Sequence, residues 1–291
     1  MGELELVVDA KAVLGEGPSW DAKKKQLYWV DIMSKRIHRY DPQTGKNETI
    51  ELDQPVGAVV PTREGDLIAA MQNGFYRISE DGSQITPLGD PEEDKPDNRF
   101  NDGKCDVTGR FWAGTMAMKG GGPVGALYTL EKDGTIVKKL DGVTISNGLA
   151  WSPDNKTMYY IDSPTRRIDA FDFDKDSGQI VNRRTVISFP GEEGVPDGMT
   201  IDAEGMLWVA HWGGWKVWRF DPNSGRVLDE IPVPAAHVTS CCFGGEDGNE
   251  LYITTARIGL SDEELEKQPH AGGLFRIRTN VKGAPTYEYG G

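Results

Sequence analysis

The sequence predicts an all-β protein, a six-bladed β-propeller with one short helical insertion in its last blade. Six short apolar runs recur along the 291 residues, and their first residues are separated by 40, 44, 47, 49 and 44 positions. A second apolar run follows each of them, and most units then reach a turn rich in Asp, Pro and Gly. Six repeats of about 45 residues, built from short strands and turns, are typical of a propeller.

Each repeat is expected to hold its strands in the same order. The first apolar runs are residues 27–31, 67–71, 111–115, 158–162, 207–211 and 251–255. The second runs are residues 36–40, 74–78, 126–130, 167–171, 216–220 and 273–277. A segment ahead of each first run should form the strand that opens the unit, and these opening strands should line a central channel.

The two ends of the chain and one insertion complete this prediction. Residues 4–10 should pair with the last unit and close the ring, because an unpaired strand edge is a liability. Ser261 and Glu264 have the spacing of a capping box, so residues 261–267 should form the inserted turn of helix. Because no linker composition divides the chain, we expect a single domain over residues 1–291.

Composition narrows the classes of function. The chain carries 32 basic and 46 acidic residues, a net charge of −14, which argues against a nucleic-acid partner. No apolar run reaches the roughly 18 residues of a membrane span, so no membrane partner is expected. The N-terminus does not have the pattern of a signal peptide. Three cysteines, an odd number, suit a reducing compartment, and we expect a cytoplasmic protein.

Four polar side chains occupy near-equivalent positions in four different units. Glu16 and Asn147 lie 11 residues before the first apolar run of their units, and Asn101 and Asp197 lie 10 residues before theirs. A glycine stands close by in every case, where it allows a sharp turn. Because opening strands line the channel, these four side chains should meet at one end of it.

This group of donors favours a divalent cation. Like charges crowded into a channel cost free energy unless something neutralises them. Carboxylate and amide oxygens favour Ca²⁺, Mg²⁺ or Mn²⁺ over a thiolate-type zinc site. Three or four such donors leave coordination positions open for water or substrate. The alternative interpretation is that each donor is an ordinary turn residue beside a glycine.

Arg99 stands two residues before Asn101, so on an extended strand both side chains share one face. Its fork of donors can hold a substrate oxygen. It can equally form an ion pair with Glu16 or another acid of the channel.

Several motifs in this chain resemble a known family. They are R-F-N-D-G-K, S-N-G-L-A-W-S, P-D-G-M-T-I-D-A-E-G-M-L-W-V-A, S-C-C-F-G-G and Q-P-H-A-G-G-L-F. Together they resemble the senescence-marker-protein/gluconolactonase/regucalcin family. The similarity extends from G-E-G-P-S-W near the start to the C-terminus.

The resemblance implies a six-bladed propeller that hydrolyses sugar lactones with one divalent cation in its channel. Ca²⁺ is the first choice for this cation, and Mg²⁺, Mn²⁺ or Zn²⁺ are alternatives. At matching positions the implied metal ligands are Glu16, Asn147 and Asp197. The resemblance also implies that Arg99 and Asn101 bind substrate and that Asp197 is the catalytic residue, the base that activates water.

One loop departs from the family pattern. Regucalcin-like members have a longer loop after G-T-M-A, with an acidic residue that reaches substrate. Here residues 116–125 form a short, glycine-rich loop with Lys119 near that place, which puts the substrate preference in question. Two other functions remain open: a divalent-cation-binding regulatory protein without significant turnover, and a scaffold for protein interactions. A charged channel counts against the scaffold.

Overall fold

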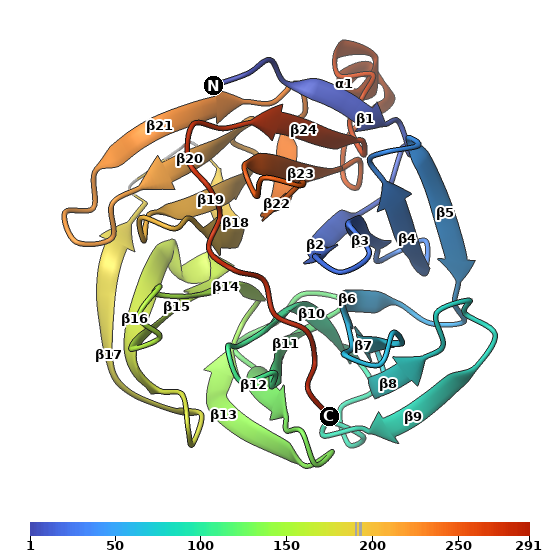
Figure 1. Cartoon of the computed structure of the whole chain (residues 1–291), viewed down its shortest axis with the longest axis vertical. Coiled ribbons are helices and arrows are strands. Elements are labelled where there is room, and N and C mark those ends of the chain that lie inside the picture. Colours follow the sequence, from blue (N-terminus) through green and yellow to red (C-terminus); the bar gives the residue numbers. More distant parts are fainter. Residues whose placement is uncertain (190, 192–193) are drawn as a thin grey trace.

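The computed structural model describes residues 1–189, 191 and 194–291, and almost all of its regular structure is β-strand. The strands form four sheets of four strands and one sheet of eight, all with antiparallel pairing. Figure 1 shows these sheets arranged around a ring. The all-β prediction is confirmed, and the arrangement is consistent with a propeller.

The four smaller sheets each take consecutive strands. They are β2 (Gly15–Asp21), β3 (Gln26–Asp31), β4 (Arg36–Asp41) and β5 (Lys46–Glu51); β6 (Val56–Pro61), β7 (Leu67–Met71), β8 (Gly74–Ile78) and β9 (Ile85–Gly89); β10 (Asn98–Cys105), β11 (Phe111–Ala117), β12 (Gly125–Leu130) and β13 (Ile136–Val143); and β14 (Ser146–Trp151), β15 (Thr157–Asp162), β16 (Arg167–Asp174) and β17 (Gln179–Ser188). A 3₁₀ turn, η1 (Ser163–Thr165), follows β15.

The eight-stranded sheet holds the remaining strands. They are β18 (Val195–Ile201), β19 (Leu207–Trp212), β20 (Lys216–Phe220), β21 (Val227–Pro232), β22 (His237–Gly244), β23 (Glu250–Ala256), β24 (Leu274–Arg278) and β1 (Glu5–Val8). Strands β18 to β21 join the other four through one pair, Trp212 with His237. As expected, β1 pairs with β24 and so joins the first strand to the last.

The strands that open the units, β2, β6, β10, β14, β18 and β22, lie nearest the centre of the ring (Figure 1). Every residue of β6 and of β14 is buried, as an inner position requires. The outermost strands β5, β9, β13, β17 and β21 were not predicted. Their side chains are mostly exposed or half-buried, so they lack the apolar run that identifies an inner strand.

The predicted helix is present as α1 (Asp262–Lys267), between β23 and β24. The Ser261 hydroxyl accepts a hydrogen bond from the Glu264 amide at 3.3 Å, and the Glu264 carboxylate accepts one from the Ser261 amide at 2.8 Å. This reciprocal pair is the capping box that the spacing indicated. Among the described residues, none of the helices has the length and apolar character that crossing a bilayer requires.

The last residues of the chain, 282–291, form a C-terminal strap across the centre of the ring (Figure 1). The amide of Ala284 donates to Ile201 O at 3.0 Å, and the amide of Tyr289 donates to Pro61 O at 2.9 Å. The strap therefore ties together inner strands of sheets that lie on opposite sides of the ring.

Four inner strands have an irregular register at the place where a predicted donor stands. Pairing shifts between Glu16 and Ser19 in β2, and in the same way within 100–103 of β10, 146–149 of β14 and 196–199 of β18. A bulge adds an unpaired residue and turns the side chain away from strict alternation. The donors can therefore face the channel although their strands are paired on either side.

The glycines at these bulges are required by close packing. A Cβ on Gly198 would lie 2.1 Å from the Ser240 hydroxyl, and one on Gly148 would lie 2.9 Å from Asp197 O. Neighbouring inner strands thus approach each other through positions without side chains.

We expect Gly198→Ala to lower the free energy of unfolding by about 1–3 kcal/mol, because the added methyl group overpacks the contact with Ser240. Thermal unfolding measures the change. Gly122→Ala is the matched control, since a Cβ there meets nothing within 4 Å. Equal melting temperatures for the two variants would show that the inner strands can move apart.

Candidate metal and substrate site

A cavity of about 420 Å³ opens at one end of the channel and contains the five side chains singled out in the sequence. They reach it from β2, β10, β14 and β18, and each is at most 6% exposed. The residues are Glu16, Arg99, Asn101, Asn147 and Asp197. The structure therefore brings together side chains that are far apart along the chain.

Two carboxyl groups, Glu16 and Asp197, line this cavity together, and both are buried. Burial, followed by the charge of Asp102, raises the pKa of Glu16 to about 8. Burial also raises the pKa of Asp197 well above its usual range, and the charges of Glu16 and Asp102 add to this. Both pKa shifts favour the protonated form of these two carboxyl groups as long as no cation neutralises them.

A third carboxylate, Asp102, is buried on β10 and was not among the predicted site residues. Its Oδ1 accepts a hydrogen bond from the amide of Gly103 at 2.7 Å, and its Oδ2 is buried without a hydrogen-bond partner among the described residues. Burial raises the pKa of Asp102, and the charge of Lys104 opposes this. The available signal was that Asp102 directly precedes a glycine, as Asp197 does.

Arg99 supplies positive charge at the same place. Its Nη1 donates to Phe100 O at 2.9 Å and to Asn101 Oδ1 at 2.8 Å. Burial lowers the pKa of Arg99 to about 10, although the charges of Glu16 and Asp197 oppose this shift. The hydrogen bonds of this side chain therefore go to an amide and a carbonyl, and the carboxylates act on it through charge.

A chain of hydrogen bonds orients the two amides. Asn101 Nδ2 donates to Asn147 Oδ1 at 3.0 Å, and Asn147 Nδ2 donates to the Ser163 hydroxyl at 2.7 Å. That hydroxyl donates in turn to Pro196 O at 2.7 Å. With its nitrogen bound to Ser163, Asn147 has an oxygen with one further lone pair for a ligand.

These donors fit a hard divalent cation. The part of the chain that the structure describes contains no group of three His, Cys, Asp or Glu side chains placed to hold a metal ion. A cation site here therefore needs the amide oxygen of Asn147 together with Glu16 and Asp197. The two buried carboxyl groups that line the cavity favour such an ion, because it would neutralise their like charges.

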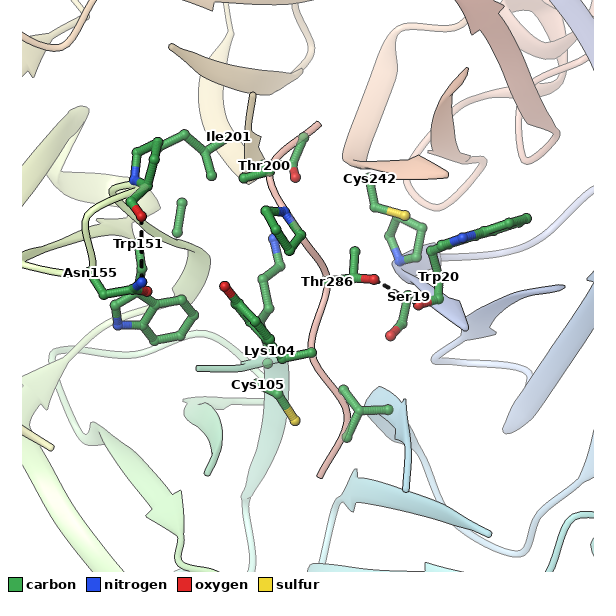
Figure 2. Close-up of a pocket in the computed structure, with 18 of the residues that line it drawn as sticks. Ser19, Trp20, Lys104, Cys105, Trp151, Asn155, Thr200, Ile201, Cys242 and Thr286 are labelled. Atoms are coloured by element: carbon green, nitrogen blue, oxygen red, sulfur yellow. Dashed lines mark hydrogen bonds between the residues drawn. The ribbon is translucent and has the colours of Figure 1, made fainter. Parts of the chain in front are cut away.

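A second, smaller cavity of about 120 Å³ lies at the other end of the same inner strands. Figure 2 shows Ser19, Trp20, Lys104 and Thr286 among the side chains that line it. Lys104 Nζ donates to Met199 O at 2.7 Å, and Thr286 belongs to the C-terminal strap. The strap therefore covers the end of the channel opposite the candidate site.

Comparison with known proteins identifies the family. Residues 14–257 match the model of the SMP-30/gluconolactonase/LRE-like region, and the chain belongs to this family. This confirms the resemblance seen in the motifs.

The chain is 43% identical to regucalcin from Xenopus laevis, with 98% of this chain and 97% of that protein covered. It is 42% identical to YvrE from Bacillus subtilis (strain 168), whose name proposes sugar lactone lactonase activity, with 98% of both covered. Among solved structures it is similar to a calcium-binding protein, regucalcin, from Agrobacterium tumefaciens strain C58. That match has a TM-score of 0.93 and 26% identity and covers 99% of this chain and 97% of the other.

The raised pKa of Glu16 predicts how the stability of the chelated protein depends on pH. Between about 4.5 and about 8 the folded state holds a proton that the unfolded state releases, so the free energy of unfolding should fall as pH rises. Asp197 contributes with the same sign. We expect the loss between pH 5 and pH 8 to be smaller in Glu16→Gln by on the order of 1–3 kcal/mol.

Urea unfolding in EDTA at the two pH values measures this difference. The native protein and Glu16→Gln share all other titrating groups, so the comparison isolates the site. The same dependence on pH in both proteins would contradict the raised pKa.

Proposed function

We propose that this protein is a metal-dependent hydrolase that opens sugar lactones. The single observation that carries the proposal is the cavity in which two buried carboxyl groups, two oriented amides and one arginine meet. Membership of the gluconolactonase family and the lactonase name of a relative that is 42% identical support it.

We also propose that the whole chain is one six-bladed propeller. The eight-stranded sheet is joined across its middle by one pair, Trp212 with His237, between β19 and β22. Division at this pair gives β18–β21 and a set of β22, β23, β24 and β1. With the four smaller sheets, these make six blades of four strands within a single domain of residues 1–291.

Glu16, Asn147 and Asp197 would hold the cation, with Ca²⁺ as the first choice and Mg²⁺, Mn²⁺ or Zn²⁺ as alternatives. When bound, the cation supplies Lewis-acid polarisation of the lactone carbonyl. Arg99 and Asn101 would hold the substrate. The guanidinium of Arg99 has donors beyond the one used for Phe100 and Asn101, and these can bind an oxygen of the lactone.

Asp197 is the proposed base. It accepts a proton from a water molecule while the water oxygen attacks the carbonyl carbon. As the carbon–oxygen bond of the ring breaks, the proton passes to the leaving ring oxygen, and the product is an open hydroxy acid. Burial of Asp197 holds its carboxyl group in a restricted position at the cavity.

A second candidate is a divalent-cation-binding regulatory protein without significant turnover. It is supported by the Agrobacterium relative, which is described as a calcium-binding protein. Both functions use the same donors, so they differ only in whether a lactone is opened.

Removal of the cation separates these functions. We expect acid release from glucono-1,5-lactone to stop after chelation and to return with Ca²⁺, Mg²⁺, Mn²⁺ or Zn²⁺, as measured by pH-stat titration. Asp197→Ala should lose Ca²⁺ binding in calorimetry together with turnover. Asp133→Ala is the control, because Asp133 lies exposed in a turn. Cation binding without acid release from any lactone would establish the regulatory alternative.

We expect Arg99→Lys to raise KM for the lactone by about tenfold or more, because a lysine keeps the charge and loses the fork of donors. Ca²⁺ affinity should change little, since Arg99 is no ligand of the cation. Steady-state kinetics and calorimetry give the two values. An unchanged KM would remove Arg99 from substrate binding.

A further inference from the structure

The cavity of the candidate site is lined by apolar side chains as well as by the polar ones described above. Besides Glu16, Arg99, Asn101, Asn147 and Asp197, which we call the polar floor, the cavity is lined by apolar side chains that belong to several units of the ring. They include Met33, Met118, Ile145, Val195, Trp212 and Ile258. We call these six side chains the apolar wall.

The side chains of the apolar wall are not core residues. Met33 is 44% exposed, and the other five are half-buried. Large apolar side chains that gather around one opening gain free energy when a ligand covers them with apolar surface. A site of about 420 Å³ also falls in the range typical of small-molecule pockets, roughly 300–1,000 Å³.

Trp212 gives this wall a fixed surface. Its ring stacks on that of His237 with centroids 3.9 Å apart and an angle of 9° between the planes. The two residues are also paired across β19 and β22. An aromatic plane held in this way can pack against a flat or extended apolar group with little further loss of side-chain entropy.

The apolar wall does not match a substrate with a hydroxyl group on every ring carbon. A buried hydroxyl without a hydrogen-bond partner costs free energy, and the side chains of the wall other than the Trp212 indole offer no donor or acceptor of ordinary strength. Lys119, which lies between β11 and β12, is exposed and is not one of the side chains that line the cavity. The polar floor can therefore bind the lactone ring while the apolar wall packs against an apolar substituent of that ring.

We propose that this site also hydrolyses lactones that carry an apolar substituent, such as an alkyl chain on the carbon beside the ring oxygen, with higher kcat/KM than sugar lactones. This inference rests on the proposed lactone hydrolysis at the same floor. The ester chemistry is unchanged: water adds to the carbonyl carbon, the ring carbon–oxygen bond breaks, and the alkyl chain stays against the apolar wall.

Two lactones with the same six-membered ring test the proposal. δ-Decalactone carries a pentyl chain, and glucono-1,5-lactone carries hydroxyl groups. In pH-stat assays with Ca²⁺ and with spontaneous hydrolysis subtracted, kcat/KM should be at least about tenfold higher for δ-decalactone. A preference for glucono-1,5-lactone would overturn this inference and leave the proposed function standing. Hydrolysis of neither lactone by cation-loaded protein would overturn the proposed function itself.

A variant of the wall gives a second test. Met33→Gln with Met118→Gln keeps the length of both side chains and adds polar groups at partly exposed positions, so folding should be preserved. The ratio of kcat/KM between δ-decalactone and glucono-1,5-lactone should fall about tenfold, mainly through KM for δ-decalactone. Val227→Thr, on the exposed outer strand β21, should leave the ratio unchanged. An unchanged ratio in the wall variant would overturn the proposal.

Discussion

The burial of like charges at the centre of the ring is the constraint on which the rest of the structure depends. Glu16, Asp102 and Asp197 lie in one channel, and burial raises the pKa of each. Such a cluster is unfavourable unless protons or a cation neutralise it. The surrounding strands must therefore be rigid enough to hold these groups together, and the close packing of neighbouring inner strands at Gly148 and Gly198 meets this need.

The site divides into parts of different structural origin. Its polar floor stands on the inner strands, where bulges aim the donors and hydrogen bonds orient the amides. Much of the apolar wall comes from turns and strand ends, such as Met33 after β3 and Ile258 after β23. Loops tolerate change better than the strands that carry them. The substrate range of such a ring can therefore change while the floor remains as it is.

The sequence predicts that the side chains of the polar floor lie together, but it does not predict the apolar wall. The repeat places Glu16, Asn147 and Asp197 in register because the inner strands share one spacing. Asp102 was missed because the bulge between Phe100 and Gly103 breaks the alternation that pointed to its neighbour. The outer strands pair with the strand next to them in sequence but lack an apolar run, and the apolar wall is assembled from distant segments. Neither therefore leaves a periodic pattern in the chain.

The C-terminal strap determines how a ligand can enter and leave the central channel. Because these last residues cover the far end of the channel, the proposed substrate and its product would enter and leave through the same opening. In the proposed reaction, the hydroxy acid formed at the polar floor would have to leave before the next lactone binds, and its carboxylate is a group that Arg99 could hold. If the ring hydrolyses lactones, as we propose, its turnover would slow as the acid product accumulates, and release of that product would be part of the catalytic cycle.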